Sequence, residues 1–182
     1  MTETYRVNEI FYSLQGEGFW TGTPAVFVRL SGCNLRCPFC DTDHAAYVAM
    51  SADEIVGRVT EFPAETVVIT GGEPSLQLDE TLVYALHRAG RRVHVETNGT
   101  RPLPADVDWV TCSPKQGGAV ALGHIDELKL VNTGWWPEPM PRADRYFLQP
   151  CSGQNIPETI QYCLEHPQWR LSLQTHKLLD IR

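Results

Sequence analysis

Residues 25–40 read AVFVRLSGCNLRCPFC, and this stretch decides how the rest of the chain is interpreted. Its first part, residues 25–31, is short and rich in β-branched and aromatic side chains, which is typical of a strand. Its second part begins at Gly32 and places three cysteines within eight residues, at positions 33, 37 and 40. A predicted strand therefore leads directly into a loop that carries reactive side chains.

The same succession of a short apolar run and a polar or glycine-rich segment recurs along the chain. Six further strands are predicted over residues 66–70, 92–96, 108–112, 127–131, 145–149 and 170–174. They run into GGEPS, TNGT, SPK, NT, PCSG and THK, respectively. The carboxyl ends of parallel strands form the active face of α/β proteins, so these segments are expected to converge on one rim. Alternatively, they are ordinary loops, which are commonly polar and glycine-rich.

Three helices are predicted between the strands. The first follows the capping-box pair Ser51 and Glu54, the second follows Asp79, and the third begins near Pro157. Their apolar faces comprise Ile55, Val56, Val59 and Phe62; Leu82, Val83, Leu86 and Ala89; and Ile160 and Leu164. Alternating strands and helices imply an α/β fold with a largely parallel sheet. A complete TIM barrel needs about 250 residues; we therefore expect an incomplete, TIM-like barrel in one domain, residues 1–182.

Composition and charge narrow the possible functions. The chain carries a net charge of −7 and a pI of about 5.3, so a broad basic surface for nucleic acid is not expected. No apolar run is long enough to span a membrane and no signal peptide is evident, so we expect no membrane partner and a cytoplasmic location. A reducing cytosol disfavours disulfides, and clustered cysteines there most often bind metal.

The cysteine spacing, C-x3-C-x2-C, fits two kinds of metal site. Three thiolates can hold three irons of a [4Fe–4S] cubane and leave the fourth iron open for chemistry, whereas four would close the cluster. Cys33, Cys37, Cys40 and His44 could instead bind zinc as a Cys3His site in a module that is not an enzyme. Spacing alone favours the iron–sulfur interpretation only modestly.

The cysteine loop resembles the signature of the radical S-adenosylmethionine (SAM) superfamily, which has an aromatic residue, here Phe39, before its last cysteine. The GGEP segment at residues 71–74 resembles the second mark of that superfamily. The resemblance implies that the open iron binds the amino and carboxylate groups of SAM and that reductive cleavage gives a 5′-deoxyadenosyl radical. It also implies the partial-barrel form of the radical SAM fold.

Further motifs are similar to those of the 7-carboxy-7-deazaguanine synthase family and cover almost the whole chain. They are LQGEG (14–18), TGTPA (21–25), VRL (28–30), CDT (40–42), ETNGT (96–100), SPK (113–115), QP (149–150) and QTHK (174–177). The resemblance implies conversion of 6-carboxy-5,6,7,8-tetrahydropterin into 7-carboxy-7-deazaguanine with loss of ammonia, in the biosynthesis of queuosine and related deazapurines. It also implies Mg²⁺, a homodimer, and a low-potential electron donor such as flavodoxin. A glycyl-radical activase, which shares the cysteine loop but acts on a protein, is the alternative within the superfamily.

Residue roles carried over from the family fall into three groups. The metal ligands are Cys33, Cys37 and Cys40 for the cluster and Thr42 for Mg²⁺. SAM is expected to contact Phe39, Cys40, Asp41, Gly72, Glu73, Ser113, Pro114, Lys115, Gln149, Pro150, Cys151 and Ser152. The pterin is expected to contact Leu14, Gln15, Gly16, Arg29, Thr70 and Arg182.

Residue chemistry supports some of these roles independently. The guanidinium of Arg29 can bind a substrate carboxylate through two parallel hydrogen bonds, although a structural ion pair is an equal alternative. A hydroxyl ligand such as Thr42 suits Mg²⁺, which prefers oxygen donors, although it could equally be a local cap. No proton donor for ammonia loss is obvious; the candidates are His44, His94, His124 and His176.

Three segments depart from the family pattern or carry no assigned role. Residues 101–108 replace an expected helix, and residues 116–126 are expected to form only a loop or a short helix. Trp135 and Trp136 lie in an apolar, proline-rich stretch. They are expected either to form a dimer contact or to pack as part of a buried loop.

Overall fold

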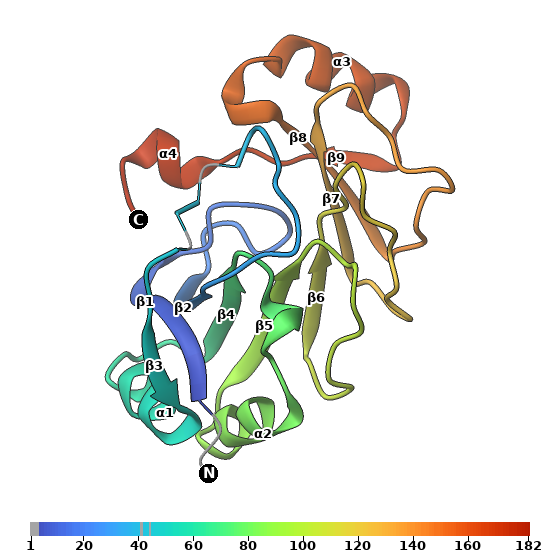
Figure 1. The fold of residues 1–182 in the computed structure, drawn as a ribbon. Helices are drawn as coiled ribbons and strands as arrows, with labels where there is room; N and C mark the ends of the chain where they lie inside the picture. Colours follow the sequence, from blue (N-terminus) through green and yellow to red (C-terminus); the bar gives the residue numbers. More distant parts are fainter. Residues whose placement is uncertain (1–3, 41, 44) are drawn as a thin grey trace.

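The computed structural model describes residues 4–40, 42–43 and 45–182 (Figure 1). Two residues named in the sequence predictions, Asp41 and His44, lie outside the described residues. No helix in the described part of the chain has both the length and the apolar composition needed to cross a bilayer.

A single nine-stranded sheet with the strand order β3-β1-β2-β4-β5-β6-β7-β8-β9 organises the molecule (Figure 1). Its strands are β1 (Thr4–Leu14), β2 (Pro24–Leu30), β3 (Val48–Ser51), β4 (Thr66–Gly71), β5 (Arg92–Thr97), β6 (Trp109–Cys112), β7 (Glu127–Asn132), β8 (Arg145–Pro150) and β9 (Trp169–Leu171). β1 is antiparallel to β2 and β3, and every pairing from β2 to β9 is parallel. The predicted largely parallel, incomplete barrel is confirmed.

The first two helices begin where their capping residues predict. In α1 (Ala52–Thr60), Ser51 and Glu54 form the reciprocal capping box, and in α2 (Glu80–Arg88) the Asp79 side chain accepts a hydrogen bond from the Leu82 backbone N–H at 3.0 Å. Two further helices, α3 (Ile156–Glu165) and α4 (Thr175–Leu179), follow in the last quarter of the chain. Short 3-10 turns cover Pro74–Leu76 and Cys151–Gly153.

Two cores cover the convex face of the sheet, and only the first is built mainly from helices. α1 and α2 pack their buried side chains against β1, β2, β4 and β5. The second core, over β6, β7 and β8, is covered by side chains of loops and of α3, among them Trp135, Trp136 and Tyr162. The two tryptophans are partly buried and pack against this core.

The segment that replaces the expected helix, residues 101–108, contributes Leu103 and Val107 to the first core as a loop. Residues 116–126 likewise contribute Val120 and Leu122 to the second core without a helix. Loops therefore perform the covering that helices perform in a full barrel, which is how this fold fits into a short chain.

Several sequence expectations about the elements were incomplete. The strands β1 and β3 and the helix α4 were not predicted, and β9 ends three residues before the predicted boundary at 174 because the chain turns into α4. In α3 the expected apolar face is not a core face: Ile160 and Leu164 are 39% and 71% exposed, and Thr159 is the buried residue of that helix.

The loop of residues 15–23 occupies the concave side of the sheet. It links β1 to β7 and to the segment that follows β9. The backbone N–H of Phe19 donates to Glu127 Oε2 at 3.0 Å, and that of Gly18 donates to Ser172 Oγ at 3.0 Å. The rings of Phe19 and Trp20 contact Trp109 with centroid distances of 5.2 and 5.4 Å. This aromatic cluster closes the amino-terminal end of the barrel.

His94 is buried against this cluster, and its titration should control stability in mild acid. Its ring centroid lies 5.1 Å from that of Trp20, and burial lowers the pKa of His94 from 6.5 to about 4. The unfolded chain therefore binds more protons than the folded chain between pH 6.5 and 4, so stability falls as the pH drops through this window. We expect a loss of up to about 3 kcal/mol of unfolding free energy from this residue.

Urea unfolding at several pH values checks this expectation. The His94→Phe variant keeps an aromatic ring and should flatten the pH dependence between 6.5 and 4. The His124→Gln variant changes a histidine whose side chain is 66% exposed and serves as the control. A wild-type slope retained in His94→Phe would contradict the assignment.

Candidate active site

A cavity of about 410 Å³ lies at the carboxyl ends of the parallel strands. Most residues with a predicted role line it. They are Leu14, Gln15, Gly16, Arg29, Cys33, Cys37, Phe39, Cys40, Thr42, Thr70, Gly72, Ser113, Lys115, Gln149, Pro150, Cys151, Ser152 and Arg182. Six strands contribute lining residues directly, and β6 and β9 contribute through the segments that follow them. Six of the seven segments expected to converge therefore meet at this cavity.

Among the described residues, two with a predicted role stand apart from this cavity, and one predicted segment does not reach it. Asp41 lies outside the described residues. Pro114 lines a neighbouring cavity of about 420 Å³. Glu73 is fully buried beneath the rim. The NT segment after β7 does not line the main cavity: Thr133 lines the neighbouring one, and Asn132 donates to Thr159 Oγ1.

The cysteine loop presents its three thiols along the cavity wall. Cys33 and Cys37 are half-buried, Cys40 is exposed, and all three are free thiols. The Cys40 backbone N–H donates to the Cys37 carbonyl at 3.1 Å, and the Leu35 N–H donates to Cys33 Sγ at 3.4 Å. Burial raises the pKa of the Cys37 thiol, and the nearby ammonium of Lys115 opposes that rise.

The spacing of the thiols differs from that of a zinc site. Among the described residues, the one group of three or more His, Cys, Asp or Glu whose ligand atoms all lie within 4.8 Å of one another does not include the cysteines. Tetrahedral zinc with Zn–S bonds of 2.3 Å would set its sulfurs about 3.8 Å apart. The three thiols are therefore spread more widely than the sulfurs around one tetrahedral zinc ion.

Two glycines of the GGEP segment let it approach the cysteine loop closely. The Gly72 N–H donates to the Leu30 carbonyl at 3.1 Å and the Glu73 N–H to the Gly32 carbonyl at 2.8 Å. A Cβ on Gly72 would lie 2.1 Å from the Gly32 carbonyl oxygen and 3.0 Å from Cys33 Cβ. Any side chain at this position would push the cysteine loop away.

The carboxylate of Glu73 holds the loop after β5 in place. It accepts hydrogen bonds from Thr97 Oγ1 at 2.6 Å, the Asn98 N–H at 2.7 Å and the Ser75 N–H at 3.0 Å. Its side chain therefore joins the loop after β4 to the loop after β5, whereas the preceding residues Gly71 and Gly72 line the cavity.

Replacing Gly72 with alanine should displace the cysteine loop without unfolding the domain. We expect the iron content after anaerobic reconstitution to fall by at least about half, because the added methyl group must move either backbone or Cys33. Gly57→Ala is the matched control. Position 57 lies within α1 with nothing within 4 Å of an added Cβ, and alanine there should stabilise the helix by about 1 kcal/mol. Full iron loading of Gly72→Ala would contradict the packing argument.

The sequence predictions missed a buried charge cluster that lines the cavity. Lys129 Nζ lies 2.6 Å from Glu17 Oε2 and 3.0 Å from Glu96 Oε2, and its side chain is 4% exposed. Burial opposes both charges, but the pairing prevails: it raises the pKa of Lys129 and lowers that of Glu17 to about 2. Lys129 stands in an apolar run, LKLV, so only its position on the concave face of β7 reveals its role.

Gln15 and Arg29 face the cavity but already have protein partners. The Gln15 side-chain N–H donates to Glu96 Oε1 at 2.8 Å, and its carbonyl accepts from the Glu17 N–H at 3.1 Å. Arg29 Nε donates to Glu9 Oε1 at 2.8 Å. The structural ion pair considered for Arg29 therefore exists, and Arg29 lines the cavity at the same time.

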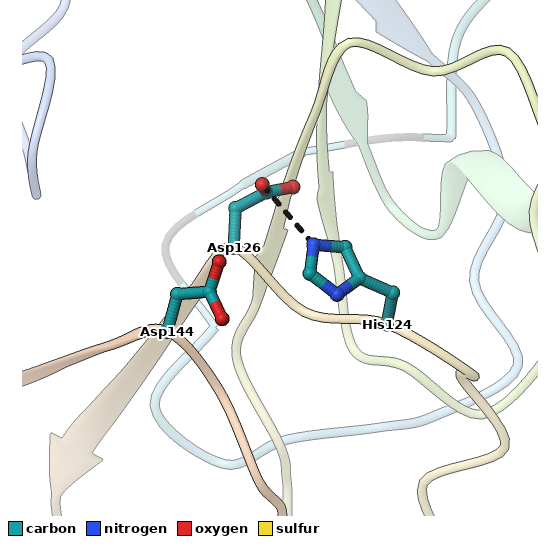
Figure 2. Close-up of side chains that lie close together, drawn as sticks. All are labelled: His124, Asp126 and Asp144. Carbon is teal, nitrogen blue, oxygen red and sulfur yellow. Dashed lines mark hydrogen bonds and ion pairs between the residues drawn. The ribbon is translucent and has the colours of Figure 1, made fainter.

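The histidines considered as proton donors lie in different places. His176 lines the cavity, His94 is buried in the aromatic cluster, and His44 lies outside the described residues. His124 lies near Asp126 and Asp144, with His124 Nε2 3.3 Å from Asp126 Oδ1, as Figure 2 shows. These residues precede β7 and β8, at the end of the barrel opposite the cavity.

Comparisons with known proteins bear on this site. The radical SAM superfamily profile matches residues 27–115. A 7-carboxy-7-deazaguanine synthase from Bacteroides thetaiotaomicron is 58% identical over 180 residues, covering 97% of this chain and 98% of that protein. One from Bordetella pertussis is 44% identical over 207 residues, covering 97% and 99%. The crystal structure of QueE from Escherichia coli matches with a TM-score of 0.76 and 29% identity over 93% of each chain.

Proposed function

The chain belongs to the 7-carboxy-7-deazaguanine synthase family, and we infer from this that it carries out the reaction of that family. It is a radical SAM lyase that converts 6-carboxy-5,6,7,8-tetrahydropterin into 7-carboxy-7-deazaguanine with loss of ammonia, in queuosine and 7-deazapurine biosynthesis. The observation that carries this conclusion is near-full-length similarity combined with the meeting of the family's motif residues around one cavity.

The two alternatives considered from the sequence are thereby excluded. A glycyl-radical activase shares the cysteine loop, but the relatives that match this chain from end to end are 7-carboxy-7-deazaguanine synthases. A zinc-binding module that is not an enzyme is excluded by the same relationship.

Membership in the radical SAM superfamily implies a [4Fe–4S] cluster and SAM, and the residues present fit both groups. The cluster would be held by Cys33, Cys37 and Cys40, which lie free along the cavity wall. When bound, the two groups supply the one-electron chemistry that begins with hydrogen abstraction from the pterin. Gly72 lines the cavity beside the thiols, and its own N–H and that of Glu73 donate to the Leu30 and Gly32 carbonyls.

We assign the rest of the SAM site to the rim loops on both sides of the cluster. The contacting residues are Phe39, Cys40, Asp41, Gly72, Ser113, Lys115, Gln149, Pro150, Cys151 and Ser152. Glu73 and Pro114 act from behind this surface: the first holds the loop after β5, and the second lies between two residues that face the cavity. Lys115 Nζ donates to the Ser113 carbonyl at 2.8 Å, which turns the β6 loop inward.

The substrate would lie over the strands β1 and β2, with its carboxylate on Arg29. The rings of Phe11 and Phe27 stack 4.9 Å apart at the cavity floor and offer an apolar surface to a flat heterocycle. Leu14, Gln15, Gly16, Thr70 and Arg182 complete this side. The cluster of Lys129 with Glu17 and Glu96 also lines the cavity and would present polar groups to the pterin edge. Of the described histidines, His176 lines the cavity and is the best placed to move a proton during ammonia loss.

Several finer properties complete the proposal. Thr42 would offer its hydroxyl to Mg²⁺ together with a substrate oxygen, because Mg²⁺ prefers oxygen ligands. Cluster reduction requires a low-potential electron donor such as flavodoxin. We further propose a single domain over residues 1–182, since all nine strands share one sheet, a cytoplasmic homodimer, and no nucleic-acid partner.

An anaerobic assay tests the function directly. The protein is reconstituted with iron and sulfide and incubated with reductant, SAM, Mg²⁺ and 6-carboxy-5,6,7,8-tetrahydropterin, with products followed by mass. We expect 7-carboxy-7-deazaguanine, and omission of Mg²⁺ should slow its formation. A brown protein that forms 5′-deoxyadenosine without the deazaguanine would contradict the substrate assignment, and a colourless zinc protein would contradict the enzyme assignment.

A further inference from the structure

The strand β1 changes its register opposite β2 immediately before Glu9. Val7 pairs with Leu30 but Glu9 pairs with Arg29, so one extra residue is inserted in β1. A one-residue shift turns the following side chains to the opposite face of a sheet. Val7 accordingly belongs to the first core, whereas Phe11 lines the cavity. Without the bulge, regular alternation would direct Glu9 into that apolar core; with it, Glu9 lies beside Arg29.

The carboxylate of Glu9 holds two guanidinium groups. Its Oε1 accepts from Arg29 Nε at 2.8 Å, and its Oε2 pairs with Arg182 Nη2. Since Arg29 is held through Nε, its two Nη groups make no recorded hydrogen bond within the described part of the chain. Two Nη donors side by side are what an end-on, two-point contact with a carboxylate requires.

Arg182 brings the C-terminal segment into the same arrangement. Its guanidinium carbon lies 4.9 Å from the ring centroid of Phe11, and its carbonyl accepts from Ser13 Oγ at 2.5 Å. The start of the segment is tied down as well, because the Thr175 N–H donates to the Gly16 carbonyl at 2.9 Å. Glu9 therefore links the cavity floor to the C-terminal wall, which carries His176.

We propose that Glu9 is a positioning residue that orients Arg29 toward the carboxylate of the substrate, with Arg182 fixing the second oxygen of Glu9. This inference rests on the proposed role of Arg29. A free arginine side chain loses rotamer entropy when it is ordered. Ordering Arg29 before the substrate arrives removes that cost from binding, which is the usual advantage of a preorganised site.

Ligand affinity tests the proposal, with the reconstituted enzyme saturated with SAM. Titration with 6-carboxypterin and with pterin, which lacks the carboxylate, gives a ratio of dissociation constants that reports the carboxylate contact alone. Glu9→Ala should weaken 6-carboxypterin about tenfold, the effect of losing one charge-assisted hydrogen bond, and leave pterin unchanged. Glu9→Gln keeps an oxygen acceptor for Arg29 Nε and should restore affinity to within about threefold.

A different role for Glu9 predicts the opposite change in the affinity for 6-carboxypterin. If its negative charge merely competes with the substrate carboxylate, Glu9→Ala will bind 6-carboxypterin as tightly as the wild type or more tightly, which would overturn the proposal. In turnover, Glu9→Ala should raise KM about tenfold and leave kcat within about twofold, because the defect lies in binding. Iron content and the melting temperature check that the fold is intact. Glu61→Ala, which breaks an exposed pair with Arg58, is the matched control.

Arg29→Gln separates this inference from the proposed function on which it rests. It should lower the affinity for 6-carboxypterin but not for pterin, and adding Glu9→Ala to it should cause no further loss. If Arg29→Gln leaves the ratio unchanged, the role of Arg29 itself is wrong. If Arg29→Gln changes the ratio and Glu9→Ala does not, only the positioning role of Glu9 is wrong.

Discussion

Replacing Cys37 with serine will leave the reconstituted protein with little or no iron–sulfur absorption and without measurable deazaguanine formation. The proposed cluster has three protein ligands, and serine substitutes a hard, poorly ionised hydroxyl for a thiolate. Removing residues that only support a metal ligand costs roughly 10- to 100-fold in affinity or activity, so loss of the ligand itself should exceed that range. Iron and sulfide analysis, visible absorption and 5′-deoxyadenosine formation measure the outcome.

Cys163→Ser is the matched control for this prediction. Cys163 lies in α3, is half-buried against the second core and does not line the cavity. We expect Cys163→Ser to retain the iron content and activity of the wild type. Equal iron loading in both variants would show that Cys37 is not a ligand, and equal iron loss in both would assign the loss to the fold.

Replacing Lys129 with methionine will lower the unfolding free energy by about 3 to 5 kcal/mol, because it leaves two carboxylates buried without their shared cation. Methionine has a similar length and packs easily, so the loss reports charge rather than volume. For a chain of this size each kcal/mol corresponds to about 2 to 4 °C in melting temperature. Thermal unfolding of the anaerobic holoenzyme at neutral pH should therefore show a decrease of about 10 °C.

Two further measurements identify the cause of this decrease. The triple variant Glu17→Gln, Glu96→Gln, Lys129→Met removes all three charges and should recover much of the lost stability. In the wild type, pairing lowers the pKa of Glu17 from 4.5 to about 2, so this stabilisation is complete above pH 4.5 and is lost as the pH falls toward 2. Lys129→Met should lack this part of the acid dependence. A triple variant no more stable than Lys129→Met would contradict the electrostatic explanation.

Seven of the nine strands and three helices could be predicted because their signals are local. Short β-branched runs that end at glycine or polar residues, the capping box at Ser51, and the cap at Asp79 each act within a few residues. β1 escaped prediction because its bulge before Glu9 breaks the regular alternation by which a strand is recognised. β3 escaped because it is a short edge strand with Val48 exposed.

The site residues could be predicted from the sequence where they belong to a recognisable motif. Cys33, Gly72 and Lys115 closely follow the ends of strands, and Gln149 lies near the end of β8. Each belongs to a distinctive segment, and the structure brings all four to one cavity. Lys129 belongs to no such motif. A lysine within an apolar run can lie on a solvated strand face as readily as in a buried site. Only the concave side of β7 and the approach of Glu17 and Glu96 give it partners.

The sequence by itself determined the family, the cysteine loop and the order of the elements, because these depend on residue types at short and fixed spacings. Tertiary structure alone decided which groups form the buried charge cluster and which side of a strand faces the cavity. Those outcomes depend on register and burial between segments far apart in the chain. Glu9 illustrates the difference: one inserted residue in β1 moves it from the core face to the side of Arg29, next to a C-terminal segment more than 170 residues away.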